Sequence, residues 1–261
     1  MSRPSPWDPD QYARFELQRS RPFHDLVGFV EPRRGMHVVD LGCGTGALTA
    51  QLHADLSAAA TLGIDSSETM LARAPAPGQA GVRFARHDIR AFCAASHDQF
   101  DLVFSNAALQ WLPDHDTLWT QVARLVAPGS QIAIQMPAND DHASHVTAQR
   151  VARQEPFATA LDGWARHFPV ETPEWYCEKL FSLGFASPRV ELRVYPHVMP
   201  SAMSVVEWTK GSLLTAYQRR LPADLFADFL ARYTQRLLAS LGDAQPYLYP
   251  FKRILMWGRR R

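Results

Sequence analysis

The feature that most constrains the fold is an alternation of short apolar runs with helix-like segments, which begins at Met36. The runs lie at 37–41, 61–65, 82–85, 100–105 and 132–136, and segments of 14 to 26 residues separate them. β-Branched runs at this spacing predict βαβ units and hence a parallel sheet. Two later runs, at 189–195 and 252–257, extend the sheet at its far edge. We therefore expect an α/β core.

A helical stripe lies between the two late strands. Apolar or aromatic residues recur there every four positions, at Leu221, Leu225, Phe229, Tyr233, Leu237 and Leu241, which is typical of a helix packed on a core. We predict a helical lid at 1–34, a core at 35–199 with a helical insertion near 140–170, a helical substrate cap at 200–250 and a final core strand at 251–261. The alternative for residues 140–168 is that they form part of the cap.

The charge balance excludes some classes of function. Lys and Arg number 27 and Asp and Glu 26, a formal net charge of +1, which argues against nucleic-acid or anionic-membrane binding because both depend on positive excess charge. The three cysteines form no CxxC pair, so neither a disulfide framework nor a metal site is expected. Without a transmembrane stretch or a signal-like N-terminus, a cytoplasmic location is predicted. The oligomeric state stays open.

The most informative segment is Asp40-Leu41-Gly42-Cys43-Gly44-Thr45-Gly46, directly after the first predicted strand. Glycines let a ligand approach the backbone where a Cβ would collide, and ligands of open α/β sheets bind at the carboxyl ends of the strands. The G-x-G-x-G spacing differs from the dinucleotide motif G-x-G-x-x-G, and no GxxxxGK[ST] phosphate loop is present. The loop therefore predicts a ligand other than a nucleotide phosphate.

Two acidic residues end the following strands. Asp65 lies about 20 residues beyond the glycines, where a carboxylate can accept hydrogen bonds from ribose hydroxyls. Asp88 closes the third predicted strand, where it can accept from an adenine amine. The alternative is purely structural: a tight turn at the glycines, Asp65 as a helix N-cap and Asp88 as a turn residue.

Together with Asn106, these residues resemble the class I S-adenosylmethionine-dependent methyltransferases over about Met36 to Met136. The resemblance implies a Rossmann-like, mostly parallel seven-stranded sheet flanked by helices, with S-adenosyl-L-methionine as cofactor. It further implies which residues contact each part of the cofactor. The methionine part would be bound by Asp40, Gly42, Gly44, Asn106 and Ala107, the ribose by Asp65 and Ser66, and the adenine by Met70, Asp88 and Ile89, with Tyr12 and Arg19 of the lid above them.

Further patterns resemble the trans-aconitate 2-methyltransferases over nearly the whole chain. They are WxPxxYxxFxxxRxRP at 7–22, LQWLPDH at 109–115, QMPxN at 135–139, YxHxMP at 195–200, Trp208 and PxxR at 250–253. Thr45 departs from the proline of some relatives, and 213–245 matches weakly. The resemblance implies a carboxyl O-methyltransferase that forms the monomethyl ester of trans-aconitate, a small polycarboxylate.

In a helix, Tyr12, Phe15 and Arg19 share one face, so this segment is predicted to cover the cofactor; the alternative is an amphipathic helix packed on the core. Arginine suits carboxylates because its fork binds them bidentately. The predicted substrate-binding residues are Arg21, His24, Trp111, Tyr176, Trp208 and Arg253. Core packing is the alternative for the aromatic residues, and surface charge for Arg21 and His24.

A carboxylate acceptor is already ionised at neutral pH, so no general base is required and no catalytic residue is predicted. Alignment and exclusion of water would supply the catalysis. Two other functions stay open. One is methyl transfer to a hydroxyl or carbon acceptor, which usually needs a base, and the other is a non-catalytic S-adenosylmethionine-binding module.

Overall fold

The computed structural model describes residues 16–75 and 80–261, with side chains from Arg21 onward. The predictions made for Tyr12 and for the side chain of Arg19 therefore lie outside the described residues. Within the described chain, residues 20–138, 169–193 and 252–261 form one compact unit, and residues 139–168 and 194–251 form another. We call them the sheet unit and the cap unit, and each is described by itself.

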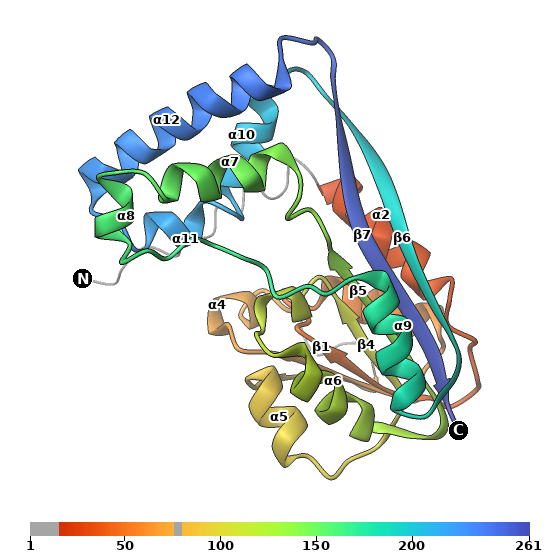
Figure 1. Ribbon diagram of the computed structural model, residues 1–261. Coiled ribbons are helices and arrows are strands. Elements are labelled where there is room, and N and C mark those ends of the chain that lie inside the picture. Colours follow the sequence, from red (N-terminus) through yellow and green to blue (C-terminus); the bar gives the residue numbers. More distant parts are fainter. Residues whose placement is uncertain (1–15, 76–79) are drawn as a thin grey trace. The chain divides into compact units, whose positions relative to one another are not determined.

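The sheet has seven strands in the order β3-β2-β1-β4-β5-β7-β6 (Figure 1). The pairs among β1 to β5 are parallel, and β7 runs antiparallel to β5. This confirms the predicted mostly parallel α/β sheet. The strand bounds are His37–Leu41 (β1), Ala60–Asp65 (β2), Val82–Arg86 (β3), Phe100–Asn106 (β4), Val126–Pro137 (β5), Phe185–Met199 (β6) and Tyr247–Arg260 (β7).

Helices cover both faces of this sheet. The helices of the sheet unit are α2 (Glu16–Val27), α3 (Ala47–Asp55), α4 (Glu68–Leu71), α5 (Ile89–Ala95), the 3-10 turn η1 (Leu109–Trp111), α6 (His115–Arg124) and α9 (Pro173–Ser182). Helices α5, α6 and α9 bury Cys93, Trp119 and Leu180 against apolar strand residues on one face. Strand side chains point alternately to the two faces of a sheet. Helices α2 and α3 cover the opposite face, which carries the alternate strand residues.

The direction of α2 follows from two contacts on that second face. The Phe23 ring meets the edge of Phe104 with centroids 5.7 Å apart. Farther along, the backbone N–H of Glu31 donates to Oε1 of Gln131 (2.9 Å), and Nε2 of Gln131 donates back to the carbonyl of Glu31 (2.8 Å). Helix α2 therefore runs opposite to β4 and β5, so that Arg21 lies toward the carboxyl ends of these strands.

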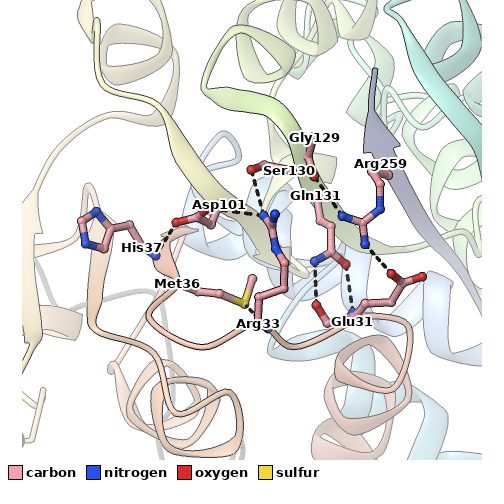
Figure 2. A network of polar contacts seen from close by, with 9 residues as sticks. All are labelled: Glu31, Arg33, Met36, His37, Asp101, Gly129, Ser130, Gln131 and Arg259. Atoms are coloured by element: carbon pink, nitrogen blue, oxygen red, sulfur yellow. Dashed lines mark hydrogen bonds and ion pairs between the residues drawn. The ribbon is translucent and has the colours of Figure 1, made fainter.

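A polar network holds the amino ends of the strands together (Figure 2). Arg33 donates to Asp101 (3.3 Å) and to Ser130 (3.0 Å), and the second Asp101 oxygen accepts from the backbone of His37 (2.9 Å). Gln131 also accepts from the indole N–H of Trp257 (2.9 Å). These contacts join β1, β4, β5 and β7 at the edge opposite to the glycine loop, so their role is structural.

The cap unit is helical, with α7 (Ala143–Ala152), α8 (Phe157–Ala160), α10 (Met203–Lys210), α11 (Thr215–Gln218) and α12 (Ala223–Leu241). The predicted stripe is confirmed as the inner face of α12, where Phe229, Tyr233 and Leu237 are fully buried. Phe229 stacks on Tyr217 at 4.7 Å, and α12 lies along α7 (Figure 1). Residues 139–168 therefore group with the cap, which is one of the two placements that the sequence left open.

Candidate active site

The glycine loop turns over the carboxyl end of β2. The backbone N–H groups of Gly42 and Cys43 both donate to the carbonyl of Ile64 at 2.9 Å. Asp65, the last residue of β2, accepts from the N–H of Gly44 through Oδ2 (2.9 Å) and from the N–H of Ser67 through Oδ1 (2.8 Å). A carboxylate can accept more than one hydrogen bond at each oxygen. Asp65 therefore fixes two loops and retains acceptor capacity toward a ligand.

Gly42 and Gly44 are glycines for different reasons. Both have positive φ, +81° and +57°. A Cβ on Gly42 would lie 2.2 Å from that of Ala108, so this glycine lets the loop pack against the segment after β4. A Cβ on Gly44 would have the Met70 methyl as its nearest neighbour, at 3.7 Å, so a ligand can approach the backbone there.

Asp40 lies buried beneath the loop. Its Oδ2 accepts from the hydroxyl of Thr49 at 2.6 Å, whereas none of the described residues donates to its buried Oδ1. Burial is the main cause that raises the pKa of Asp40 to about 7; the Thr49 hydrogen bond opposes the rise, and the nearby charge of Asp65 adds to it. A buried acceptor without a donor costs free energy, and the ammonium group of S-adenosylmethionine would supply that donor. The residues therefore fit the predicted cofactor.

This pKa predicts a pH dependence. Since the folded-state pKa of Asp40 is raised from 3.8 to about 7, its contribution to stability is full below pH 3.8 and is lost as the pH rises toward 7. A cationic ligand prefers the carboxylate, so affinity should rise with pH through about 7. In Asp40→Asn this rise should disappear. Calorimetric titration with S-adenosylmethionine between about pH 5.5 and 8.5 measures both proteins, and an identical slope in the variant would contradict the assignment.

The predicted adenine residues lie beside the same loop. The δ-methyl of Ile89 is 3.5 Å from the position that a Cβ on Gly42 would take. Asp88 is exposed and caps α5, its Oδ1 accepting from the N–H of Ala91 at 2.9 Å, so the structural alternative accounts for one of its oxygens. Ser66 is exposed next to Asp65. The N-cap of α4 is Ser67, so the alternative role of Asp65 as an N-cap is wrong.

Asn106, at the end of β4, is joined to two further strands. Its Oδ1 accepts from Nε2 of Gln135 on β5, and Oε1 of Gln135 accepts from Nη1 of Arg253 on β7 at 3.1 Å. Gln135 and Arg253 are both buried. The sequence singled out Asn106 and Arg253 separately, whereas Gln135 occurred in a motif without a role. The sequence signal that could have indicated a role for Gln135 is a polar residue inside the apolar run of β5.

The segment after Asn106 turns sharply. Ala107 has φ +57°, donates its N–H to the carbonyl of Gln135 (3.0 Å) and accepts from the side chain of Gln110 through its own carbonyl (2.6 Å). Trp111 follows on η1 and is 49% exposed. The turn brings Ala108, the neighbour of the predicted cofactor residue Ala107, against the glycine loop at Gly42.

The predicted substrate residues are placed very differently from one another. Arg21 and His24 lie on exposed positions of α2, whereas Arg253 is 4% exposed. Trp208 belongs to the cap unit, where it is buried and stacks on His197 at 5.2 Å. Packing within the cap unit is therefore enough to explain why the Trp208 ring is buried, as in the core-packing alternative. Among these residues Arg253 alone is linked to a predicted cofactor residue by the contacts described, through Gln135.

Tyr176 lies in the core of the sheet unit. Its side chain is fully buried where α9 packs on α6, and its hydroxyl lies 2.6 Å from Nδ1 of His115 and accepts from the N–H of Glu171 at 3.0 Å. Rings of Trp119 and Trp175 lie about 5 Å from its own ring. These contacts match the core-packing alternative that the sequence left open, and a substrate contact of Tyr176 stays a prediction.

Within residues 16–75 and 80–261, no helix is long and apolar enough to cross a membrane. In the same ranges, histidine, cysteine and acidic side chains form no group able to hold a metal ion.

Residues 38–129 match the family described as "Methyltransferase domain". Trans-aconitate 2-methyltransferase of Deinococcus radiodurans is 42% identical over 97% of this chain and 98% of its own length.

Solved structures share the fold at lower identity. An S-adenosylmethionine-dependent methyltransferase of Mesorhizobium loti superposes with a TM-score of 0.50 at 24% identity, covering 91% of this chain and 97% of the other. Phosphoethanolamine N-methyltransferase 2 of Haemonchus contortus gives 0.56 at 18% identity, covering 92% of this chain and 52% of the other. With the fold, the glycine loop and the near full-length similarity in agreement, the chain belongs to the trans-aconitate 2-methyltransferase family.

Proposed function

We propose that the protein transfers the methyl group of S-adenosylmethionine to a carboxylate of trans-aconitate and so forms a monomethyl ester. The observation that carries this proposal is the buried guanidinium of Arg253, which is joined through Gln135 to Asn106. A buried cation at the carboxyl ends of the strands favours an anionic acceptor, because the attraction of opposite charges is strong away from water. The similarity to the enzyme of Deinococcus radiodurans supports the same acceptor.

The residues that would hold the cofactor belong to β1, β2 and the loops that follow them. Asp65 retains acceptor capacity for ribose hydroxyls, Gly44 leaves the backbone open to the ligand, and Asp40 offers a buried acceptor to a cationic group. Bound there, S-adenosylmethionine supplies an electrophilic methyl group. The chain's own part in the reaction is to orient the acceptor and to exclude water from its carboxylate.

The decisive experiment is transfer of labelled methyl from S-adenosylmethionine to a panel of small acids that includes trans-aconitate. We expect one methyl group per acid and a product that mild alkali cleaves, because an ester is hydrolysed whereas an ether or a C-methyl group is not. A label stable to alkali would indicate a hydroxyl or carbon acceptor. Tight cofactor binding without transfer to any acid would indicate a binding module and would overturn the proposal.

A cytoplasmic location stays a prediction from the sequence, and it is part of this proposal. The described cysteines, Cys43, Cys93 and Cys177, are free thiols, as expected in a reducing compartment. Burial raises the pKa of Cys43 and of Cys93, so both thiols are poor nucleophiles at neutral pH.

A further inference from the structure

Asn106, Gln135 and Arg253 lie in a row across three strands. In the sheet register, Asn106 pairs directly with Gln135, and Gln135 pairs with Leu255. Arg253 is two residues from Leu255 on β7, so its side chain leaves the same face of the sheet. The row is therefore a consequence of strand register, and its members are held by backbone pairing on both sides of β5.

The chemistry of the row fixes the orientation of both amides. A guanidinium has only donors, so Gln135 must turn its oxygen toward Arg253, as the 3.1 Å contact shows. The Nε2 group of Gln135 then faces Asn106 and can only donate, so Asn106 must accept this hydrogen bond through Oδ1. The Nδ2 group of Asn106 is left on the other side, where none of the described residues accepts from it. Asn106 is partly exposed, so this donor is within reach of a ligand.

We infer that Arg253 and Gln135 position Asn106 so that its amide nitrogen donates to a carboxylate of a bound ligand. Gln135 is thus a positioning residue, and Asn106 is the residue that contacts the ligand. This inference rests on the proposed function. Two sources of the carboxylate share this chemistry: the amino-acid end of S-adenosylmethionine and the acceptor acid.

A second observation agrees with a charged, zwitterionic ligand at this edge of the sheet. Asp40 pairs with Phe104, two residues before Asn106, so Asp40 and Asn106 share a face of the sheet on neighbouring strands. Asp40 offers an acceptor that none of the described residues uses, and Asn106 offers a donor. An acceptor beside a donor complements an ammonium group beside a carboxylate.

Gln135→Glu tests the orientation directly. Glutamate is nearly isosteric and keeps an acceptor for Arg253, but it also presents an acceptor to Asn106, whose amide must then turn over and point Oδ1 at the ligand. Since a hydrogen bond to a charged group contributes substantially to binding, we expect the affinity for the carboxylate ligand to fall about 10- to 100-fold. Asn106→Asp, which replaces the donor itself, should lose at least as much. Combining the two changes should add little, because both act on one donor.

Gln131→Leu is the matched control. Gln131 is also buried on β5, four residues away and on the same face, but its amide holds Glu31 and Trp257 at the amino ends of the strands. It should lower the midpoint of thermal unfolding and leave ligand affinities of the folded protein unchanged. Gln135→Glu should show the opposite pattern, with unfolding close to wild type and altered affinities.

The ligands separate the two sources of the carboxylate. If it belongs to the cofactor, calorimetry will show that Gln135→Glu and Asn106→Asp weaken S-adenosylmethionine but not its decarboxylated analogue. If it belongs to the acceptor, cofactor affinity will hold and KM for the acid will rise by the same factor. Either result supports the inference. Unchanged values for both ligands, or equal losses for S-adenosylmethionine and the decarboxylated analogue, would overturn it. Calorimetric titration of trans-aconitate into the same proteins needs no turnover either, so binding measurements alone decide the inference even if no acid is methylated.

Discussion

Replacing Asp65 with alanine should weaken S-adenosylmethionine binding by about 100-fold or more. The change removes the acceptor predicted for the ribose hydroxyls, and it also releases the N–H groups of Gly44 and Ser67, which Asp65 holds at 2.9 and 2.8 Å. Hydrogen bonds to charged groups contribute about 1.5–3 kcal/mol each, and two such bonds correspond to a factor of 100 or more. The measurement is calorimetric titration of the wild type and the variant with S-adenosylmethionine.

Asp55→Ala is the control for this change. Asp55 is an exposed carboxylate at the end of α3, and its contact is the side chain of Gln51 in the same helix. Its removal should leave cofactor affinity unchanged. Unchanged affinity in Asp65→Ala would refute the assignment of the cofactor site. Loss of affinity together with a large drop in the unfolding midpoint would instead show that Asp65 acts mainly by holding the two loops.

Replacing Arg253 with alanine should raise KM for the acid by about 100-fold. A bidentate contact between guanidinium and carboxylate is among the strongest polar interactions available in a site shielded from water. Affinity for S-adenosylmethionine should fall much less than affinity for the acid. Without the guanidinium, Gln135 is no longer forced to turn its oxygen toward β7, but it can still donate to Asn106 and so keep most of the positioning. Steady-state kinetics with trans-aconitate and calorimetry with the cofactor measure the two effects separately.

Arg253→Lys keeps the charge at this position but loses the planar fork, so it should recover part of the affinity for the acid. An equal loss of acid and cofactor binding in Arg253→Ala would indicate a folding role. Thermal unfolding checks that outcome, because removal of the buried cation leaves the side-chain oxygen Oε1 of Gln135 without its donor and lowers stability.

Much of the sheet could be predicted from the sequence because its signals are local. The β-branched runs at 37–41 and 100–105 each carry their own evidence, and the G-x-G-x-G loop marks the strand end at which ligands bind. The prediction that Asp65 binds a ligand rests on equally local evidence, an acidic residue at the end of a strand. Its second function was not predictable, because the 2.9 Å contact with Gly44 joins loops that follow different strands.

The role of Gln135 depended on information that the sequence does not carry locally. Its partners lie on β4 and β7, and only the strand register places them on either side of it. The core position of Tyr176 depends on distant residues in the same way. The side of α9 that faces the core is set by packing against Trp119 on α6, so the sequence left core packing and substrate contact both open. The grouping of residues 139–168 with the cap likewise depends on the distant helix α12.

The strand order also has a consequence for biosynthesis. β7 follows every other strand in the sequence but is inserted between β5 and β6. While the chain leaves the ribosome, β5 has β4 on one side and an unpaired, apolar edge on the other, and such an edge is open to pairing with other chains. The nascent protein therefore needs its edge shielded until translation reaches β7. Arg253 arrives with that strand, so the site is completed in the same step that closes the sheet.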